Sequence, residues 1–138
     1  MNMANEMKVQ LRQVSASASE AAIGRHRVLI DRPGAKGGAD AGPMGGELFL
    51  AAVGGCFMSN LLAAIRAREV EISEVRVEVV GFLTDSPARF EGVELRVAAE
   101  SRDRELLGRL VEIADRGCIT MNTLRGSLDV RVLIGATV

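Results

Sequence analysis

One uninterrupted apolar segment constrains how this chain can fold. From Leu48 to Met58 every residue is apolar or small, and the pattern becomes amphipathic only after Asn60. A helix that is apolar on all faces is buried in a larger core, so we expect a helix over residues 47–69 that enters the domain centre. Its apolar stretch is shorter than the roughly 20 residues of a membrane span, so we expect no membrane partner. Gly54 and Gly55 each cost a helix about 1 kcal/mol relative to alanine, which indicates close approach of a neighbour, most simply another helix.

The flanking sequence predicts short strands and one further helix. Strands are expected where apolar and polar residues alternate or follow a turn, at 9–14, 27–31, 75–79, 93–97 and 128–134. The third and fourth form a hairpin through turn residues 84–87, and residues 32–46 form a Gly- and Pro-rich loop. A second helix is capped by Asp103 and ends at Gly117. We expect one α+β domain over residues 1–138, with helices covering one face of the sheet.

Composition excludes several function classes. The 138 residues include no Trp, no Tyr and 4 Phe, which disfavours a stacking surface for single-stranded nucleic acid. Lys and Arg number 17 and Asp and Glu number 18, so no charge excess favours nucleic acid or an anionic membrane. One His and two Cys, 62 positions apart (118 minus 56), make no ligand cluster, so we expect no metal and no cofactor. The N-terminal MNMANEMKVQ lacks a signal-peptide pattern, so we expect a cytoplasmic protein with reduced thiols.

The two cysteines are the candidates for chemistry. Each has an ordinary alternative role as a small buried residue. Redox chemistry needs a thiolate, which a cation, hydrogen bonds or a helix N-terminus can stabilise. Cys118 has such a setting if residues 118–124 begin a new helical turn. On an ideal helix the face of Cys56 is narrow and mostly apolar, and it suits an organic substrate. That face also carries Phe49, Ala52, Val53, Ser59, Asn60 and Ala63.

Other polar residues have weaker claims to a site. Glu47 lies nine positions before Cys56 (56 minus 47), about 180° around an ideal helix, so direct contact needs a kink or a partner chain. His26 is the only histidine and is expected to be a solvated strand residue. The glycines at 34, 37 and 38 lack the spacing of a phosphate-binding loop and indicate loop flexibility.

The segment 42–56, GPMGGELFLAAVGGC, resembles the signature of the OsmC/Ohr family, a Pro-containing loop followed by E-L-x-L-A-A-x-G-G-C. Residues 114–118, ADRGC, with the closing strand, resemble that family's second cysteine segment. The resemblance spans nearly the whole chain. It implies an OsmC-like α+β fold in which antiparallel sheets wrap around central cysteine-bearing helices of an interleaved homodimer. Close approach of those helices would then explain Gly54 and Gly55.

The resemblance also implies an activity. In characterised members the first cysteine attacks an organic hydroperoxide, becomes a sulfenic acid and condenses with the second, and a dithiol such as a lipoyl group reduces the disulfide. Carried over, Cys56 is peroxidatic and Cys118 resolving. The alternatives are a non-catalytic dimer that binds a small hydrophobic or thiol ligand, and cysteines that serve packing only.

Two departures place the chain nearer to the broader OsmC-like branch than to the hydroperoxide-resistance branch. That second branch has its carboxylate ten positions before the first cysteine, where this chain has Gly46, and Glu47 occupies the next position. It also sets an N-terminal arginine against the thiolate. Here Arg12, Arg25 and Arg27 are positional candidates only.

Overall fold

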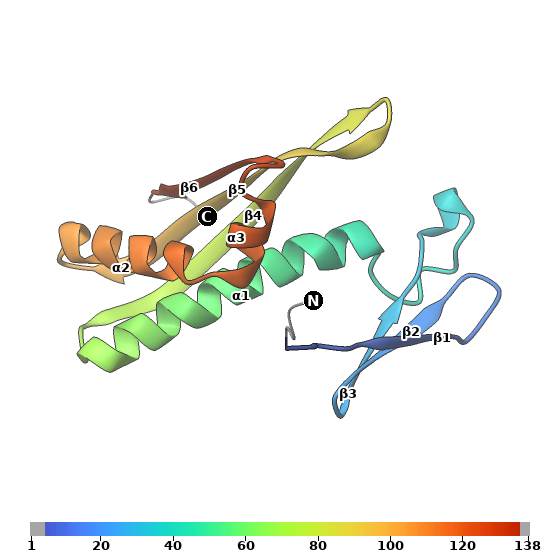
Figure 1. The fold of residues 1–138 in the computed structure, drawn as a ribbon, viewed down its shortest axis with the longest axis horizontal. Helices are drawn as coiled ribbons and strands as arrows, with labels where there is room; N and C mark the ends of the chain where they lie inside the picture. The colour runs from blue at the N-terminus through green and yellow to red at the C-terminus, as the bar shows by residue number, and fades with distance from the viewer. Residues whose placement is uncertain (1–4, 136–138) are drawn as a thin grey trace. The chain divides into compact units, whose positions relative to one another are not determined.

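The structure of the protein is a computed structural model that describes residues 5–135. The chain divides into two compact units, Met1–Phe49 and Leu50–Val138 (Figure 1). The assignment of residues 1–138 to a single domain stays a prediction. The α+β class is confirmed, because two small sheets are combined with helices.

The N-terminal unit contains a three-stranded antiparallel sheet. Its strands β1 (Gln10–Gln13), β2 (Ser19–Ile23) and β3 (His26–Ile30) pair in chain order. The strands expected at 9–14 and 27–31 are confirmed, and β2 lies between them. His26 is exposed in β3, as expected for a solvated strand residue.

The glycine-rich loop of this unit is tied to one buried carboxylate. Asp31 is 3% exposed and accepts backbone N–H hydrogen bonds from Arg32, Ala39 and Ala41 at 2.7, 3.0 and 3.1 Å. These bonds, led by that of Ala41, lower the pKa of Asp31. A single 3₁₀ turn, η1 (Gly34–Lys36), lies within this loop. The loop is therefore held by specific hydrogen bonds, beyond the simple flexibility expected of its glycines.

Helix α1 (Gly45–Arg68) begins in the N-terminal unit and continues through the C-terminal unit. The helix expected over 47–69 is thus confirmed, with a start two residues earlier. It has 24 residues, and its most apolar 18-residue window has a mean hydropathy of 2.0, of which 33% is buried within the chain. By length and composition alone the helix is long and apolar enough to cross a membrane, so its uncharged stretch is longer than expected, but the core helix of a soluble protein passes the same test. The helix carries no charged residue from Leu48 to Ile65. Core helices of soluble proteins can also have uncharged stretches of this length.

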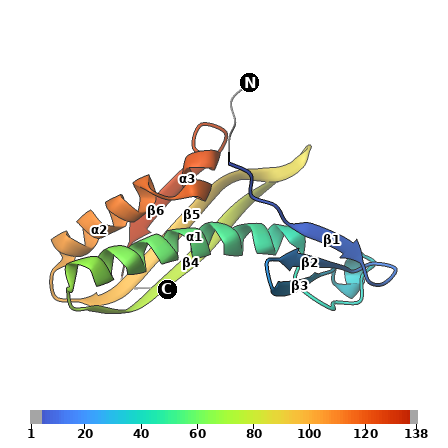
Figure 2. The ribbon, with the colours of Figure 1, turned by 60° about the horizontal axis from the view of Figure 1, so that its bottom comes forward.

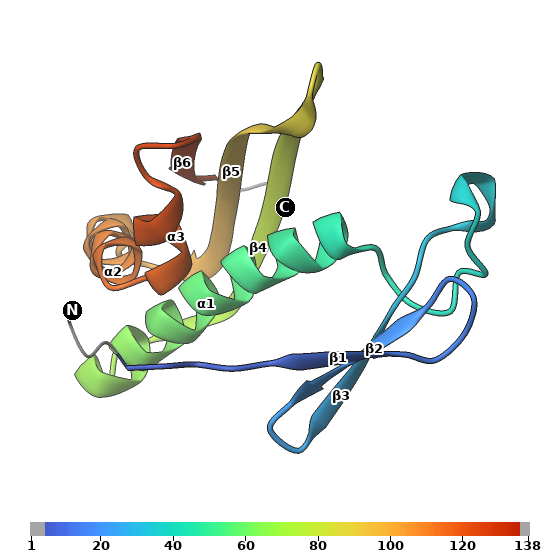
Figure 3. The same cartoon turned by 45° about the vertical axis from the view of Figure 1, so that its right-hand side comes forward.

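The C-terminal unit is a three-stranded sheet covered by helices. Strands β4 (Ile72–Asp85) and β5 (Ala88–Ser101) form the expected antiparallel hairpin, longer than the alternation indicated. The last strand, β6 (Asp129–Ile134), pairs parallel to β5. Figures 2 and 3 show α1 and α2 (Arg104–Arg116) on the same face of this sheet. The largest fully buried side chains of this unit are Phe57, Leu61, Leu95, Leu107, Leu110 and Met121.

Helix α2 ends where the sequence indicated. The carboxylate of Asp103 accepts the N–H of Leu106 at 2.9 Å and caps the first turn, and Gly117 follows the last turn. A short helix, α3 (Ile119–Leu124), follows and leads toward β6. The helical turn expected at 118–124 is therefore present.

Gly54 packs against a strand. A Cβ atom at this position would lie 2.5 Å from Cγ2 of Val79 in β4. The expected close neighbour therefore exists, but it is a strand and not another helix. At Gly55 an added Cβ would meet no described atom within 4 Å apart from its chain neighbours and the backbone of its own helix. Packing against other elements of the chain therefore does not require a glycine there.

Candidate functional site

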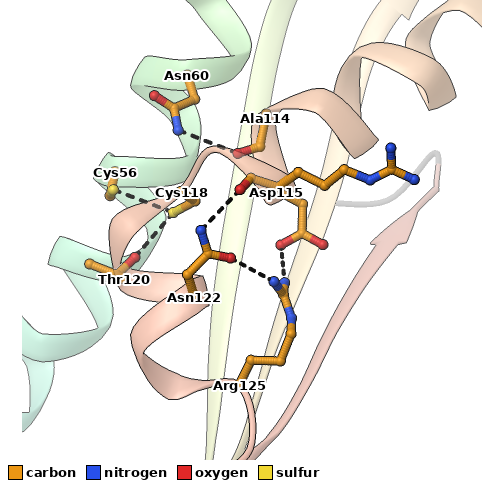
Figure 4. Close-up of polar contacts among 9 residues, drawn as sticks. Cys56, Asn60, Ala114, Asp115, Cys118, Thr120, Asn122 and Arg125 are labelled. Atoms are coloured by element: carbon orange, nitrogen blue, oxygen red, sulfur yellow. Dashed lines mark hydrogen bonds and ion pairs between the residues drawn. The ribbon is translucent and has the colours of Figure 1, made fainter.

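The fold brings the two cysteines into contact. Cys56 lies in the middle of α1 and Cys118 directly precedes α3, and their Sγ atoms are 3.3 Å apart (Figure 4). Both are free thiols, and Cys118 donates the hydrogen bond to Cys56. A disulfide has an S–S distance of about 2.05 Å, so a closure of about 1.3 Å would join them. This contact unites two segments that are 62 positions apart.

The end of α2 and the start of α3 fix Cys118. The N–H of Gly117 donates to the carbonyl of Ile113 at 3.2 Å, and the carbonyl of Cys118 accepts the N–H of Asn122 at 2.9 Å. Cys118 is fully buried at 0% exposure, whereas Cys56 is half-buried. A small reagent therefore meets Cys56 first.

Hydrogen bonds favour the thiolate of Cys56. Burial is the largest single influence and would raise the pKa of this thiol, because it disfavours the charged form. Donors around the sulfur outweigh it: the backbone N–H groups of Thr120 and Ile119, the Cys118 thiol and the Thr120 hydroxyl. The net result is a pKa below the usual value of a cysteine. The principal donors are neutral groups at the start of α3.

The environment acts in the opposite direction on Cys118. Burial, the largest influence, raises its pKa, and the neighbouring Cys56 raises it further. Hydrogen bonds from the Thr120 hydroxyl and the Met121 backbone offset part of this effect. In the reduced pair Cys56 therefore ionises first, while Cys118 keeps its proton.

A polar cluster anchors α3 to the end of α2. The Asn122 side chain donates to the carbonyl of Arg116 at 2.9 Å and accepts from Arg125 at 2.8 Å. Arg125 also forms an ion pair with Asp115 (Figure 4). The cluster holds the first turn of α3 in the position from which its N–H groups reach Cys56.

Asn60, a polar residue from the expected Cys56 face, has a defined partner in this region. Its amide donates to the carbonyl of Ala114 at 3.3 Å and links α1 to α2. The sequence did not indicate a role in the site for four residues near the two cysteines: Asp115, Thr120, Asn122 and Arg125. Asp115 lies in the ADRGC segment and Thr120 lies two residues after Cys118, but no local signal pointed to Asn122 or Arg125.

The remaining candidates lie in the N-terminal unit. The carboxylate of Glu47 accepts the N–H of Met44 at 2.9 Å, which caps the start of α1. Arg12 pairs with Glu20 at 3.1 Å, and Arg27 donates to the carbonyls of Gly24 and His26. Each of these groups thus has a partner within its own unit. Across residues 5–135, no group of three or more His, Cys, Asp or Glu is arranged to hold a metal ion.

Solved structures similar to this chain share its fold. An OsmC-like protein from Mycoplasma pneumoniae superposes with a TM-score of 0.82 at 17% identity, covering 99% of this chain and all (100%) of the other. The organic hydroperoxide resistance protein OhrB of Bacillus subtilis gives a TM-score of 0.66 at 28% identity, covering 93% and 96%. An organic hydroperoxide resistance protein OsmC from Legionella pneumophila gives 0.74 at 20% identity, covering 98% and 100%.

The sequence itself matches a family model. No curated protein sequence matches the chain. The model of the OsmC-like proteins matches residues 37–132, a range that includes both cysteines. The chain therefore belongs to the OsmC-like protein family.

Proposed function

We propose that this protein is a thiol-dependent peroxidase that reduces organic hydroperoxides, with Cys56 as the peroxidatic and Cys118 as the resolving cysteine. The 3.3 Å contact between these sulfurs carries the proposal. The half-buried thiol has the lowered pKa and the fully buried thiol has the raised pKa. Membership of the family supports it, as does similarity to two proteins named for organic hydroperoxide resistance.

The first step uses the thiolate of Cys56. Its sulfur attacks the terminal oxygen of the hydroperoxide, so an S–O bond forms while the O–O bond breaks. The alkoxide takes up a proton and leaves as the alcohol, and Cys56 is left as a sulfenic acid. The face of α1 that carries Cys56 is mostly apolar in sequence, which favours an alkyl substrate over a polar one.

The second step protects Cys56 from further oxidation. The sulfur of Cys118 attacks that of Cys56, the S–S bond forms, and the S–O bond breaks. The hydroxyl leaves as water with the proton of Cys118. An external dithiol, of the lipoyl type, would then reduce the disulfide by thiol exchange. We place this cycle in the cytoplasm, where unpaired cysteines remain thiols.

A second copy of the chain would complete the molecule. One face of α1 is exposed in the single chain although it carries almost only small or apolar residues. These are Ala51, Ala52, Gly55, Ser59, Leu62 and Ala63. Covering this face in a homodimer would remove it from water and would give Gly55 the close neighbour that it lacks within the chain. Glu47 stays a candidate for the site on the basis of its motif position.

One equivalent of an alkyl hydroperoxide tests the proposal. We expect the reduced protein to lose both free thiols and to yield a peptide pair joined by Cys56 and Cys118, measured by thiol titration and mass spectrometry. Cys56→Ser should abolish peroxide consumption. Cys118→Ser should instead accumulate a single oxidation on Cys56. Free thiols that persist in the native protein would refute the peroxidase and favour the non-catalytic binding alternative.

A further inference from the structure

The hydroxyl of Thr120 occupies a defined place beside the sulfur pair. Its Oγ1 atom lies 3.2 Å from Sγ of Cys118, which in turn lies 3.3 Å from Sγ of Cys56. Figure 4 shows Thr120 and Cys56 both joined to Cys118 by these contacts. By geometry either atom could donate in the contact between Thr120 and Cys118. Because the single thiol hydrogen of Cys118 is directed to Cys56, we assign the Thr120 hydroxyl as the donor.

We propose that Thr120 is a catalytic residue of the resolving step, whose hydroxyl donates a hydrogen bond to Cys118 Sγ while that sulfur loses its proton and attacks the oxidised Cys56. This inference rests on the proposed peroxidase function. It assigns a role in the second half of the reaction to a side chain that the sequence did not single out.

The need for such a donor follows from the position of Cys118. Its sulfur is fully buried and must develop negative charge during the attack, which is unfavourable in an apolar environment. In the reduced protein the Cys118 proton is directed to Cys56. Once Cys56 carries a sulfenic hydroxyl, the same proton would face that hydroxyl. That hydroxyl accepts the proton as the S–O bond breaks and leaves as water. Cys118 is thereby oxidised, the sulfenic sulfur is reduced, and no further reductant is consumed.

Hydrogen bonding by Thr120 also affects the pKa values of both thiols. The bond from its hydroxyl lowers the pKa of Cys118 and so partly offsets the burial of that thiol. The hydroxyl has one hydrogen and serves one sulfur at a time, and when it is directed to the Cys56 thiolate it contributes to the lowered pKa of that thiol. Cys56 has other donors, in the backbone N–H groups of Ile119 and Thr120, that survive replacement of the Thr120 side chain. Loss of the hydroxyl should therefore impair Cys118 more than Cys56.

The test separates the two steps in rapid-quench experiments on the full chain. Reduced protein is mixed with an alkyl hydroperoxide, quenched with acid, and assayed by mass spectrometry for the sulfenic acid and the disulfide. In Thr120→Val, which keeps the branched shape, we expect disulfide formation to slow about tenfold or more, as befits a lost hydrogen bond to a developing charge. Formation of the sulfenic acid should fall by no more than about threefold, since its backbone donors remain. Excess peroxide should then produce more sulfinic acid on Cys56 than in the native protein.

Two control variants distinguish chemistry from structure. Thr120→Ser restores a hydroxyl and should restore the rate of disulfide formation. Thr123→Val makes the same change one turn later, where the hydroxyl donates to the carbonyl of Ile119, and should leave both steps at native rates. A Thr120→Val protein that forms the disulfide at the native rate would overturn the inference. So would a parallel loss of both steps that serine does not rescue.

A second experiment without peroxide tests the role of Thr120 independently of the proposed peroxidase function. An aromatic disulfide reagent converts Cys56 to a mixed disulfide and releases one chromophoric thiolate. Attack by Cys118 then releases the second as a first-order phase. Thr120→Val should slow this second phase by about the same factor, because the same sulfur attacks. If the native protein shows this second phase but never forms a sulfenic acid with the peroxide, the proposed peroxidase function is refuted. If the second phase is as fast in Thr120→Val as in the native protein, the proposed role of Thr120 is refuted.

Discussion

The thiols of Cys56 and Cys118 differ in acidity although they share one hydrogen bond. Cys56 accepts that bond and receives further donors from the start of α3, whereas Cys118 is fully buried beside the charge that Cys56 acquires. A nucleophile needs the thiolate form. The arrangement is consistent with the proposed roles, in which Cys56 attacks an external substrate and Cys118 attacks the oxidised Cys56.

Removal of the Cys118 donor should raise the pKa of Cys56. Cys118→Ala deletes the donor, whereas Cys118→Ser keeps a hydroxyl in its place, and both proteins carry a single thiol. We expect alkylation of Cys56 by iodoacetamide at neutral pH to be about tenfold slower in the alanine variant, since one hydrogen bond to the thiolate is lost. Its rate should also reach half of its plateau at a higher pH than in the serine variant. Identical pH profiles for the two variants would show that Cys118 does not stabilise the thiolate.

At the scale of elements, α1 packs closely against β4 because Gly54 has no side chain. The Cβ of an alanine at position 54 would lie 2.5 Å from a methyl group of Val79. That methyl belongs to a β-branched residue with little rotamer freedom, so helix or strand must shift. Such a shift would also move Cys56, which lies two residues later on the same helix.

Gly54→Ala should therefore destabilise the protein although alanine favours helices. We expect overpacking to lower the free energy of unfolding by about 2–3 kcal/mol, because the rigid Val79 cannot move aside. This loss exceeds the gain of about 1 kcal/mol from helix propensity. Gly108→Ala in α2 is the matched control, because its Cβ would have its nearest described neighbour, Ile134, at 4.0 Å. That variant should gain stability in urea unfolding at the same protein concentration. If both substitutions stabilised the protein equally, Val79 would have to move aside at no cost, which would contradict the prediction.

Some of this architecture was predictable from local pattern. The alternation in the hairpin, the Asp103 cap and the Gly117 stop are encoded in neighbouring residues, and each lies where the pattern placed it. The parallel pairing of β6 with β5 depends on a connection through α2 and α3, which no local pattern specifies. The contact between Cys56 and Cys118 and the anchoring of α3 by Arg125 are likewise tertiary. Residue type and the family resemblance therefore indicated the two cysteines, but neither indicated a role for Thr120 or Asp115.

At the scale of the whole molecule, the exposed face of α1 predicts association of two chains. Leu62 on this face is 43% exposed, and Ile113 on α2 is 44% exposed. We expect the native protein to sediment as a dimer and Leu62→Asp to sediment as a monomer, because a carboxylate would be buried without a partner at the interface. Ile113→Asp introduces the same charge at equal exposure and should remain dimeric. A native protein that is monomeric at micromolar concentration, as judged by analytical ultracentrifugation, would contradict the homodimer.

The central claim is that the environment of Cys56 makes it a peroxide-reactive thiolate. Its most direct test is the second-order rate constant for oxidation of Cys56 by an alkyl hydroperoxide in Cys118→Ser, measured against free cysteine at the same pH. The account predicts that Cys56 reacts much faster than free cysteine, and faster with the alkyl hydroperoxide than with hydrogen peroxide. A rate constant equal to that of free cysteine for both peroxides would contradict it.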